Sequence, residues 1–186
     1  MSKKVAVLLA QGFEEAEAIV TIDILRRLGI EVEILACQDP RMVLGYKGIQ
    51  LLADALLAER QTHLYDAIIL PGGPQGACNL GGNGEVLAFV QAHQAADRWI
   101  CAICSAGAHV LAANNLLQGK RYVCSGENHT LYADGCYVDA PIVEDGKILT
   151  CKGLGLVFEF ALAVGSRLGE VDLARTVGEH IYLDER

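Results

Sequence analysis

The segment Trp99-Ile100-Cys101-Ala102-Ile103-Cys104-Ser105-Ala106-Gly107-Ala108 joins a buried strand to the start of a helix. The apolar run before Cys104 has the composition of a strand inside a parallel sheet. The small residues after it allow a sharp turn, which would expose the Cys104 thiol at the strand end, as in a nucleophile elbow. The pattern therefore predicts a strand, a turn that carries a candidate nucleophile, and a helix over residues 105–114.

Strands and helices are expected to alternate on both sides of this elbow. Expected strands cover residues 4–10, 31–36, 66–70 and 121–125, with a hairpin around Asp145-Gly146, and expected helices cover residues 14–28, 85–96, 154–168 and 171–178. This alternation predicts an α/β fold with a mostly parallel sheet and helices on both faces. No linker or repeat interrupts the chain, so residues 1–186 are expected to form a single domain.

Composition excludes several classes of function. Hydrophobic residues make up 52% of the 186 residues and charged residues 20%, which is incompatible with intrinsic disorder. The net charge of −8 disfavours nucleic-acid and membrane-surface partners, and no apolar run is long enough to span a bilayer. Seven cysteines, without a recognisable signal peptide, predict free thiols in the cytoplasm.

The loop after the first strand carries Glu14, Glu15 and Glu17 at the start of a helix. Glu14 and Glu15 suit the positive end of the helix dipole, and Glu15 is expected to point away from the sheet. Glu17 instead shares the apolar stripe of the helix. A carboxylate on a buried face needs a partner or a proton, unless it bends out to solvent or caps a neighbouring loop.

Two further loops are expected at the same edge of the sheet. Cys104 is the candidate nucleophile, with a packed core thiol as the alternative. Cys101 and Cys104 also form a C-x-x-C pattern, which is interpreted as accidental because Cys101 lies inside a strand. Gly72 and Gly73 expose backbone amides after the strand at residues 66–70, with an ordinary tight turn as the alternative. A zinc site would need a second close pair of cysteines, and the sequence offers none, so no zinc site is expected.

Taken together, these loops resemble the DJ-1/ThiJ/PfpI superfamily over nearly the whole chain. The segments that carry the resemblance are Gly12-Phe13-Glu14-Glu15-Ala16-Glu17, Asp66-Ala67-Ile68-Ile69-Leu70-Pro71-Gly72-Gly73, Ala102-Ile103-Cys104-Ser105-Ala106-Gly107, Asp145-Gly146-Lys147-Ile148-Leu149-Thr150, Gly153-Leu154-Gly155 and Phe158-Glu159-Phe160-Ala161. The resemblance implies a flavodoxin-like three-layer sandwich and a homodimer. A helical wheel places Ile19 and Ile22 on the outward side of the first helix, where they would form dimer contacts.

The resemblance also implies roles for individual residues. Cys104 would be the reactive cysteine and Glu17 its carboxyl partner, and the backbone amides of Gly72, Gly73 and Ser105 would bind an oxyanion. Many members carry a histidine about twenty residues after the cysteine, but the segment Val123-Cys124-Ser125-Gly126 has none. His129 lies shortly after it and is the candidate auxiliary residue.

These residues suggest a cysteine-dependent enzyme that acts on aldehydes or dicarbonyls, of the glyoxalase III or protein deglycase type, without metal or organic cofactor. In this hypothesis Glu17 holds a proton and the helix N-terminus lowers the thiol pKa, so that the Cys104 thiolate attacks the carbonyl. The alternative is a non-enzymatic redox sensor or chaperone in which peroxide oxidises Cys104. An intracellular peptidase or amidotransferase-like hydrolase is disfavoured because no histidine stands in the family positions.

Overall fold

The computed structural model describes residues 3–183 and is built around a seven-stranded sheet. The strand order is β10-β11-β7-β6-β1-β2-β5, and every neighbouring pair is parallel except β10 and β11. The strands are β1 (Lys4–Leu9), β2 (Glu31–Ala36), β5 (Ala55–Leu56), β6 (Ala67–Leu70), β7 (Trp99–Ile103), β10 (Ile142–Asp145) and β11 (Ile148–Cys151). The predicted mostly parallel sheet and the hairpin around Asp145-Gly146 are confirmed.

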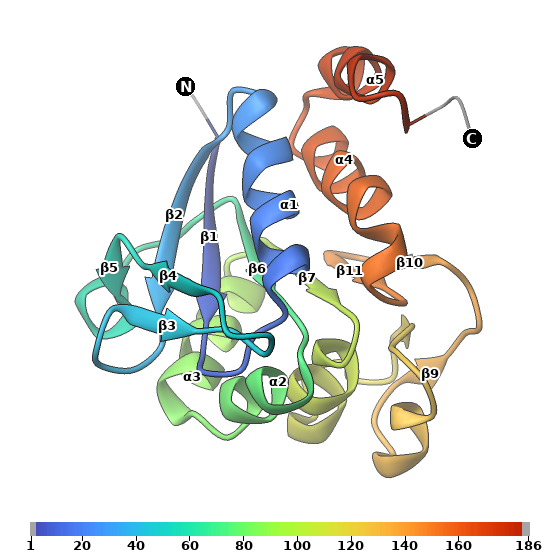
Figure 1. Ribbon diagram of the computed structural model, residues 1–186. Coiled ribbons are helices and arrows are strands. Elements are labelled where there is room, and N and C mark those ends of the chain that lie inside the picture. Colours follow the sequence, from blue (N-terminus) through green and yellow to red (C-terminus); the bar gives the residue numbers. More distant parts are fainter. Residues whose placement is uncertain (1–2, 184–186) are drawn as a thin grey trace.

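Helices cover both faces of the sheet. The α-helices are α1 (Glu15–Arg27), α2 (Pro74–Gly81), α3 (Gly84–Ala95), α4 (Val157–Arg167) and α5 (Val171–His180). Val5 and Val7 of β1 are buried with residues of α1, α4 and α5, whereas Ala6 and Leu8 are buried with residues of α2 and α3. Alternate residues of one strand therefore enter two different core layers, as the pleat requires. The flavodoxin-like three-layer arrangement is thus confirmed, with α1 and α4 side by side (Figure 1).

Two predicted elements differ in the structure. The segment expected to form a helix after Cys104 is a π-helical turn, η2 (Gly107–Leu111), followed by a 3₁₀ turn, η3 (Ala112–Asn114). A Cβ atom on Gly107 would lie 2.7 Å from the carbonyl oxygen of Val123, so this turn packs directly on the neighbouring backbone. Of the strand expected at residues 121–125, only β8 (Arg121–Tyr122) forms, and it pairs with β9 (Cys136–Tyr137) outside the main sheet.

A hairpin that the sequence patterns did not predict clamps the loop after β1. It consists of β3 (Met42–Leu44) and β4 (Gln50–Leu52), which pair antiparallel. The Gly12 N–H donates to the Leu44 carbonyl at 2.8 Å, and the Tyr46 N–H donates to the Phe13 carbonyl at 2.8 Å. The chain between β4 and β6 continues through β5 and the 3₁₀ turn η1 (Leu57–Arg60). The hairpin therefore fixes the backbone from which α1 begins.

Of the two α1 residues predicted to face outward, only Ile19 is exposed in the structure. The side chain of Ile19 is exposed, with 40% of its surface accessible, whereas Ile22 is 7% exposed and buried. Ile22 belongs to the same core cluster as Phe160 and Val164 of α4, because α4 packs beside α1 and covers that side of the helix. Ile22 therefore stabilises the folded chain and is not available as a surface contact.

The remaining turns complete the chain between the sheet and the C-terminal helices. The 3₁₀ turn η4 (Asn128–Leu131) lies between β8 and β9, and η5 (Leu154–Leu156) leads from β11 into α4. Across residues 3–183, no helix has both the length and the apolar character needed to cross a bilayer. All seven cysteines are free thiols, so no disulfide joins these elements.

Candidate active site

The three loops that the sequence analysis singled out meet at the carboxyl edge of the sheet. The Glu14 N–H donates to the Gly72 carbonyl at 3.0 Å, which joins the loop after β1 to the loop after β6. The Ser105 hydroxyl donates to the Gly73 carbonyl at 3.2 Å, which joins the loop after β6 to the loop after β7. These loops lie where the connections from β1 and β6 run to opposite sides of the sheet, the usual place for a ligand in such folds.

Cys104 lies at the tip of a strained turn directly after β7. Its φ angle is +62°, a left-handed conformation that is costly for a residue with a side chain and recurs at functional turns. Its N–H donates to the Cys151 carbonyl at 2.9 Å, which ties the turn to the end of β11. The side chain is half-buried and retains access to solvent. This geometry is that of the nucleophile elbow expected from the sequence.

Glu17 is completely buried in the first turns of α1. The Gly72 N–H donates to its Oε2 atom at 2.8 Å, and Oε1 has no hydrogen-bond partner in the described part of the chain. Burial raises the pKa of Glu17 to about 7, and the hydrogen bond from Gly72 only partly offsets this effect. The predicted buried carboxyl is therefore present, and it can both hold and release a proton near neutral pH.

Glu17 and Cys104 flank the same point in space, next to Gly72. A Cβ atom on Gly72 would lie 2.8 Å from Glu17 Oε2 and 3.2 Å from Cys104 Sγ, so only a glycine leaves room for both groups. Hydrogen bonding between the thiol and the carboxylate lowers the pKa of Glu17, although less than burial raises it. The two groups therefore share one site, in which each affects the pKa of the other.

The expected acidity of the thiol is not found. Burial, together with the negative charge of ionised Glu17, raises the pKa of Cys104 to about 11. The segment after Cys104 begins as a π-helical turn rather than the expected α-helix, and the Ser105 amide at its start lowers the thiol pKa by less than burial raises it. Near neutral pH Cys104 is consequently a thiol, beside a Glu17 carboxyl that is close to its own pKa and can accept a proton when it is ionised.

The three amides predicted to bind an oxyanion have different surroundings. The Gly72 N–H is already donated to Glu17, so this amide orients the carboxyl group instead of facing a ligand. The Ser105 N–H faces the Cys104 sulfur and lowers the thiol pKa. The Gly73 N–H makes no hydrogen bond within residues 3–183. Gly73 and Ser105 therefore remain as candidate donors to a developing negative charge.

His129 does not complete a triad with Cys104. Its ring stacks on Tyr137 with a centroid distance of 3.8 Å, and neither ring nitrogen hydrogen-bonds the thiol among the residues described. Ser125 lies beside the elbow instead, because its N–H donates to the Cys104 carbonyl at 3.2 Å, and its hydroxyl lowers the pKa of Cys104. The sequence patterns missed Ser125 because a single serine in a turn carries no motif, and only its place opposite Cys104 reveals it.

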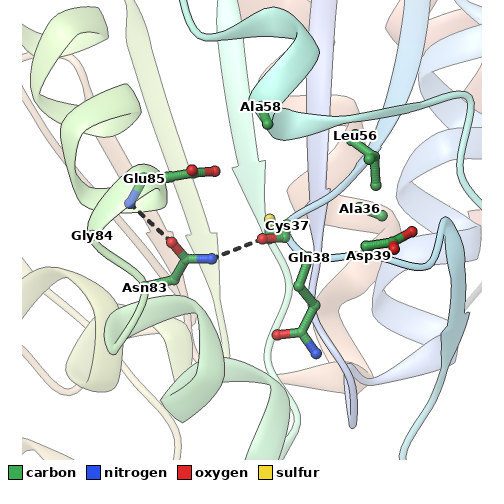
Figure 2. Close-up of a pocket in the computed structure, with 9 residues that line it drawn as sticks. All are labelled: Ala36, Cys37, Gln38, Asp39, Leu56, Ala58, Asn83, Gly84 and Glu85. Atoms are coloured by element: carbon green, nitrogen blue, oxygen red, sulfur yellow. Dashed lines mark hydrogen bonds between the residues drawn. The ribbon is translucent and has the colours of Figure 1, made fainter.

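Two large hollows lie away from this pair. One, of about 640 Å³, opens beside the ends of β2 and β5, where the Asn83 side chain bridges the Cys37 carbonyl and the Glu85 N–H (Figure 2). The other, of about 740 Å³, lies at the opposite edge of the sheet near Arg98 and Lys147. Neither hollow is lined by Cys104 or Glu17. The candidate active site is therefore identified by the thiol and the buried carboxyl, and not by a cavity. Residues 3–183 contain no cluster of three or more His, Cys, Asp or Glu side chains suited to a metal ion.

The structure is an α/β sandwich in which a cysteine at a nucleophile elbow lies beside a buried carboxyl. The sequence pattern of the DJ-1/PfpI family matches residues 3–166, and the chain belongs to this family. It is 31% identical to protein dj-1beta of Drosophila melanogaster, with 98% of each chain covered. It is 33% identical to the glutathione-independent glyoxalase DJR-1.2 of Caenorhabditis elegans, covering 81% of this chain and 80% of that one.

A solved structure shows the same architecture. The crystal structure of a cysteine-to-alanine variant of a DJ-1 superfamily protein from Salmonella typhimurium superimposes with a TM-score of 0.95. It is 58% identical in sequence and covers 97% of this chain and 98% of that one. The family match and the agreement over nearly the full length support a DJ-1-type function for this chain.

Proposed function

We propose that this protein is a cofactor-independent enzyme that converts small 2-oxoaldehydes, such as methylglyoxal, into hydroxy acids. Cys104 is the nucleophile and Glu17 the group that moves protons. The observation that carries the proposal is the fully buried Glu17 carboxyl, whose pKa is raised to about 7 by burial and which shares one site with the Cys104 thiol. A general base is most effective when its pKa lies near the working pH. The glyoxalase among the relatives supports the same substrate class.

The reaction begins when Cys104 Sγ forms a bond to the aldehyde carbon and its proton passes to Glu17. Glu17 returns this proton to the carbonyl oxygen, whose developing charge faces the Gly73 and Ser105 amides, and a hemithioacetal results. Ionised Glu17 then takes the proton from the former aldehyde carbon and delivers it to the neighbouring ketone carbon, while the hydroxyl proton of the first carbon passes to the ketone oxygen, which leaves a thioester. One carbon is oxidised and its neighbour reduced, so no external oxidant is needed. Water cleaves the resulting thioester into hydroxy acid and free thiol.

Partners and location belong to the same proposal. The exposed side chains of Ile19, Leu44 and Tyr46 lie on α1 and the β3–β4 hairpin, which are joined through the loop after β1, and this surface supports a homodimer. Free thiols at all seven cysteines suit a reducing compartment, which supports a cytoplasmic location. The net charge of −8 opposes nucleic-acid and membrane-surface partners.

The proposal is tested by adding methylglyoxal to the purified protein without glutathione and measuring D-lactate with a chiral assay. We expect D-lactate from the unmodified protein and from Cys136→Ser, which removes an exposed thiol elsewhere. Cys104→Ser and Glu17→Gln should reduce the rate to background, because one lacks the nucleophile and the other cannot accept a proton. Retention of activity in Cys104→Ser would refute the proposal. Peroxide-dependent protection of client proteins without turnover would favour the redox sensor instead.

A further inference from the structure

Ser125 is held directly opposite Cys104 by backbone contacts. Its N–H donates to the Cys104 carbonyl at 3.2 Å. Just before it, the Val123 N–H donates to the hydroxyl of the buried Thr150 at 2.9 Å, which fixes this segment to β11. Gly126 follows with a φ angle of +54°, so the chain turns away immediately after Ser125. The position of the Ser125 side chain beside the elbow is therefore built into the fold.

Asn128 determines where the Ser125 hydroxyl points. Its Nδ2 atom donates to the Ser125 carbonyl at 3.0 Å and to Ser125 Oγ at 3.3 Å. A serine hydroxyl has a single proton to donate. Because Ser125 Oγ accepts from Asn128, that proton is directed elsewhere, and the Cys104 sulfur is the acceptor beside it. Asn128 in turn is fixed by its own N–H, which donates to the Ser125 carbonyl at 3.4 Å.

The other serine at the elbow cannot supply this hydrogen bond. The Ser105 hydroxyl donates its proton to the Gly73 carbonyl at 3.2 Å, so only its backbone N–H faces the sulfur. Glu17 donates to the sulfur only while it is protonated, and when ionised it repels a thiolate. Ser125 is therefore the side-chain donor whose action does not depend on the protonation of Glu17.

We propose that Ser125 donates a hydrogen bond to Cys104 Sγ and that Asn128 is the positioning residue that directs it. The inference deepens the proposed function, because the sulfur gains negative charge when its proton leaves for Glu17 and again when the thioester is cleaved. A hydroxyl donor stabilises the thiolate relative to the thiol at both steps. Its contribution is constant with pH, whereas that of Glu17 reverses as the carboxyl ionises.

The test measures the pH dependence of iodoacetamide alkylation at Cys104 by mass spectrometry, without substrate, so it does not depend on any turnover. Ser125→Ala should slow alkylation at pH 8 by roughly tenfold, because a hydrogen bond to a charged group is lost. Ser125→Thr, which keeps the hydroxyl, should restore the rate. Asn128→Asp should slow alkylation at least as much, because a carboxylate accepts the Ser125 proton and turns it away from the sulfur.

The matched control is Thr130→Ala, which removes an exposed hydroxyl bonded to the Glu127 carbonyl in the same turn and should leave the alkylation profile unchanged. If Ser125→Ala and Asn128→Asp both give the profile of Thr130→Ala, the inference is wrong. Should Ser125→Ala fail to fold by circular dichroism, the Asn128→Asp profile decides alone. If the unmodified protein forms no lactate while the variants change alkylation as expected, the proposed reaction is wrong and the inference on Ser125 still holds.

Discussion

Glu15 and Glu17 lie two residues apart in the first turns of α1, and both are buried. Their environments nevertheless shift their pKa values in opposite directions. Glu15 is 2% exposed, and its Oε1 atom accepts from the Lys47 N–H at 2.6 Å and the Ile49 N–H at 3.2 Å. Glu17 is 0% exposed and accepts from the Gly72 N–H. Burial opposes ionisation of both carboxyls, but backbone donors lower the pKa of Glu15 while the pKa of Glu17 rises to about 7.

The difference shows that the number of backbone donors decides whether a buried carboxyl stays ionised as a structural anchor or has a pKa suited to proton transfer. Glu15 is surrounded by amides of the β3–β4 hairpin, so it stays ionised and anchors that hairpin to α1. Each carboxyl keeps one oxygen without a hydrogen-bond partner in the described part of the chain, but Glu17 has one amide and one thiol where Glu15 has two amides. A buried carboxyl with fewer donors costs stability and gains a pKa suited to proton transfer.

The largest effect is expected from Glu15→Ala. This substitution leaves the Lys47 and Ile49 amides without their charged acceptor, and we expect a loss of about 4 kcal/mol in the free energy of unfolding at pH 7. Because the folded pKa of Glu15 is lowered, its contribution exists above the unfolded pKa and disappears as the pH falls through the folded value. Urea unfolding at pH 7 and pH 3 measures both effects.

A suitable control for this experiment is Glu14→Ala, the neighbouring acidic residue that precedes α1 and makes no side-chain cap to the helix. Its removal should change the free energy of unfolding by less than about 1 kcal/mol, since it loses only the helix-dipole interaction and a weak repulsion of Glu17. Equal losses for Glu14→Ala and Glu15→Ala would contradict the anchoring role of Glu15.

Glu17→Gln is expected to act in the opposite direction and stabilise the protein at alkaline pH. The folded pKa of about 7 lies above the reference value of 4.5, so the folded state binds more protons between these values and stability falls as pH rises through them. The full cost above pH 7 is about 3 kcal/mol. The variant should therefore exceed the unmodified protein by about this amount at pH 8 and by little at pH 5.

The same variant also reports on the thiol. Removing the charge of Glu17 should lower the pKa of Cys104, because ionised Glu17 raises it. Alkylation of Cys104 near pH 8 should then accelerate while lactate formation stops, which separates thiol reactivity from proton transfer. The sequence patterns assign the proton to Glu17, and on that assumption Glu17→Ala should raise the pKa of Cys104. Slower alkylation in Glu17→Ala would support that assumption, whereas faster alkylation would support the repulsion by ionised Glu17.

The contrast also shows what the sequence could and could not reveal. The 3.6-residue period places Glu17 correctly on the sheet-facing stripe, and the run of apolar residues before Cys104 places the elbow correctly. The same helical wheel directs Glu15 away from the sheet, but it does not show that the β3–β4 hairpin buries this side chain. The hairpin over residues 42–52 has no strong periodic pattern, so the surface that covers Glu15 could not be anticipated.

Long-range contacts explain the other differences. Ile22 looks solvent-facing on an isolated helix, and only the packing of α4 beside α1 buries it. The Gly72 amide looks available for a ligand, but it donates to a carboxyl 55 residues earlier in the chain. Ser125 and Cys104 meet across two separate segments. Local periodicity therefore predicts elements and faces, whereas the partners of each polar group depend on tertiary structure.

The smallest of the expected effects comes from Gly72→Ala, which tests whether Glu17 and Cys104 need to be this close. The added Cβ would lie 2.7 Å from Cys104 Cβ and 2.8 Å from Glu17 Oε2, so the two groups must separate. We expect a loss of about 2 kcal/mol in unfolding free energy. The pKa of Glu17 should also change, because the contact with Cys104 is part of what sets it. Carboxyl carbon chemical shifts followed by NMR across pH 5–9 measure that change.

The matched control is Gly155→Ala, since nothing lies within 4 Å of a Cβ atom at that position. Gly155→Ala should leave both the stability and the Glu17 titration unchanged. If Gly72→Ala behaves in the same way, the Gly72 position is not what holds the carboxyl and the thiol together. If instead stability falls while the Glu17 titration stays fixed, the raised pKa comes from burial alone, and Glu17 would differ from Glu15 only in its missing amides.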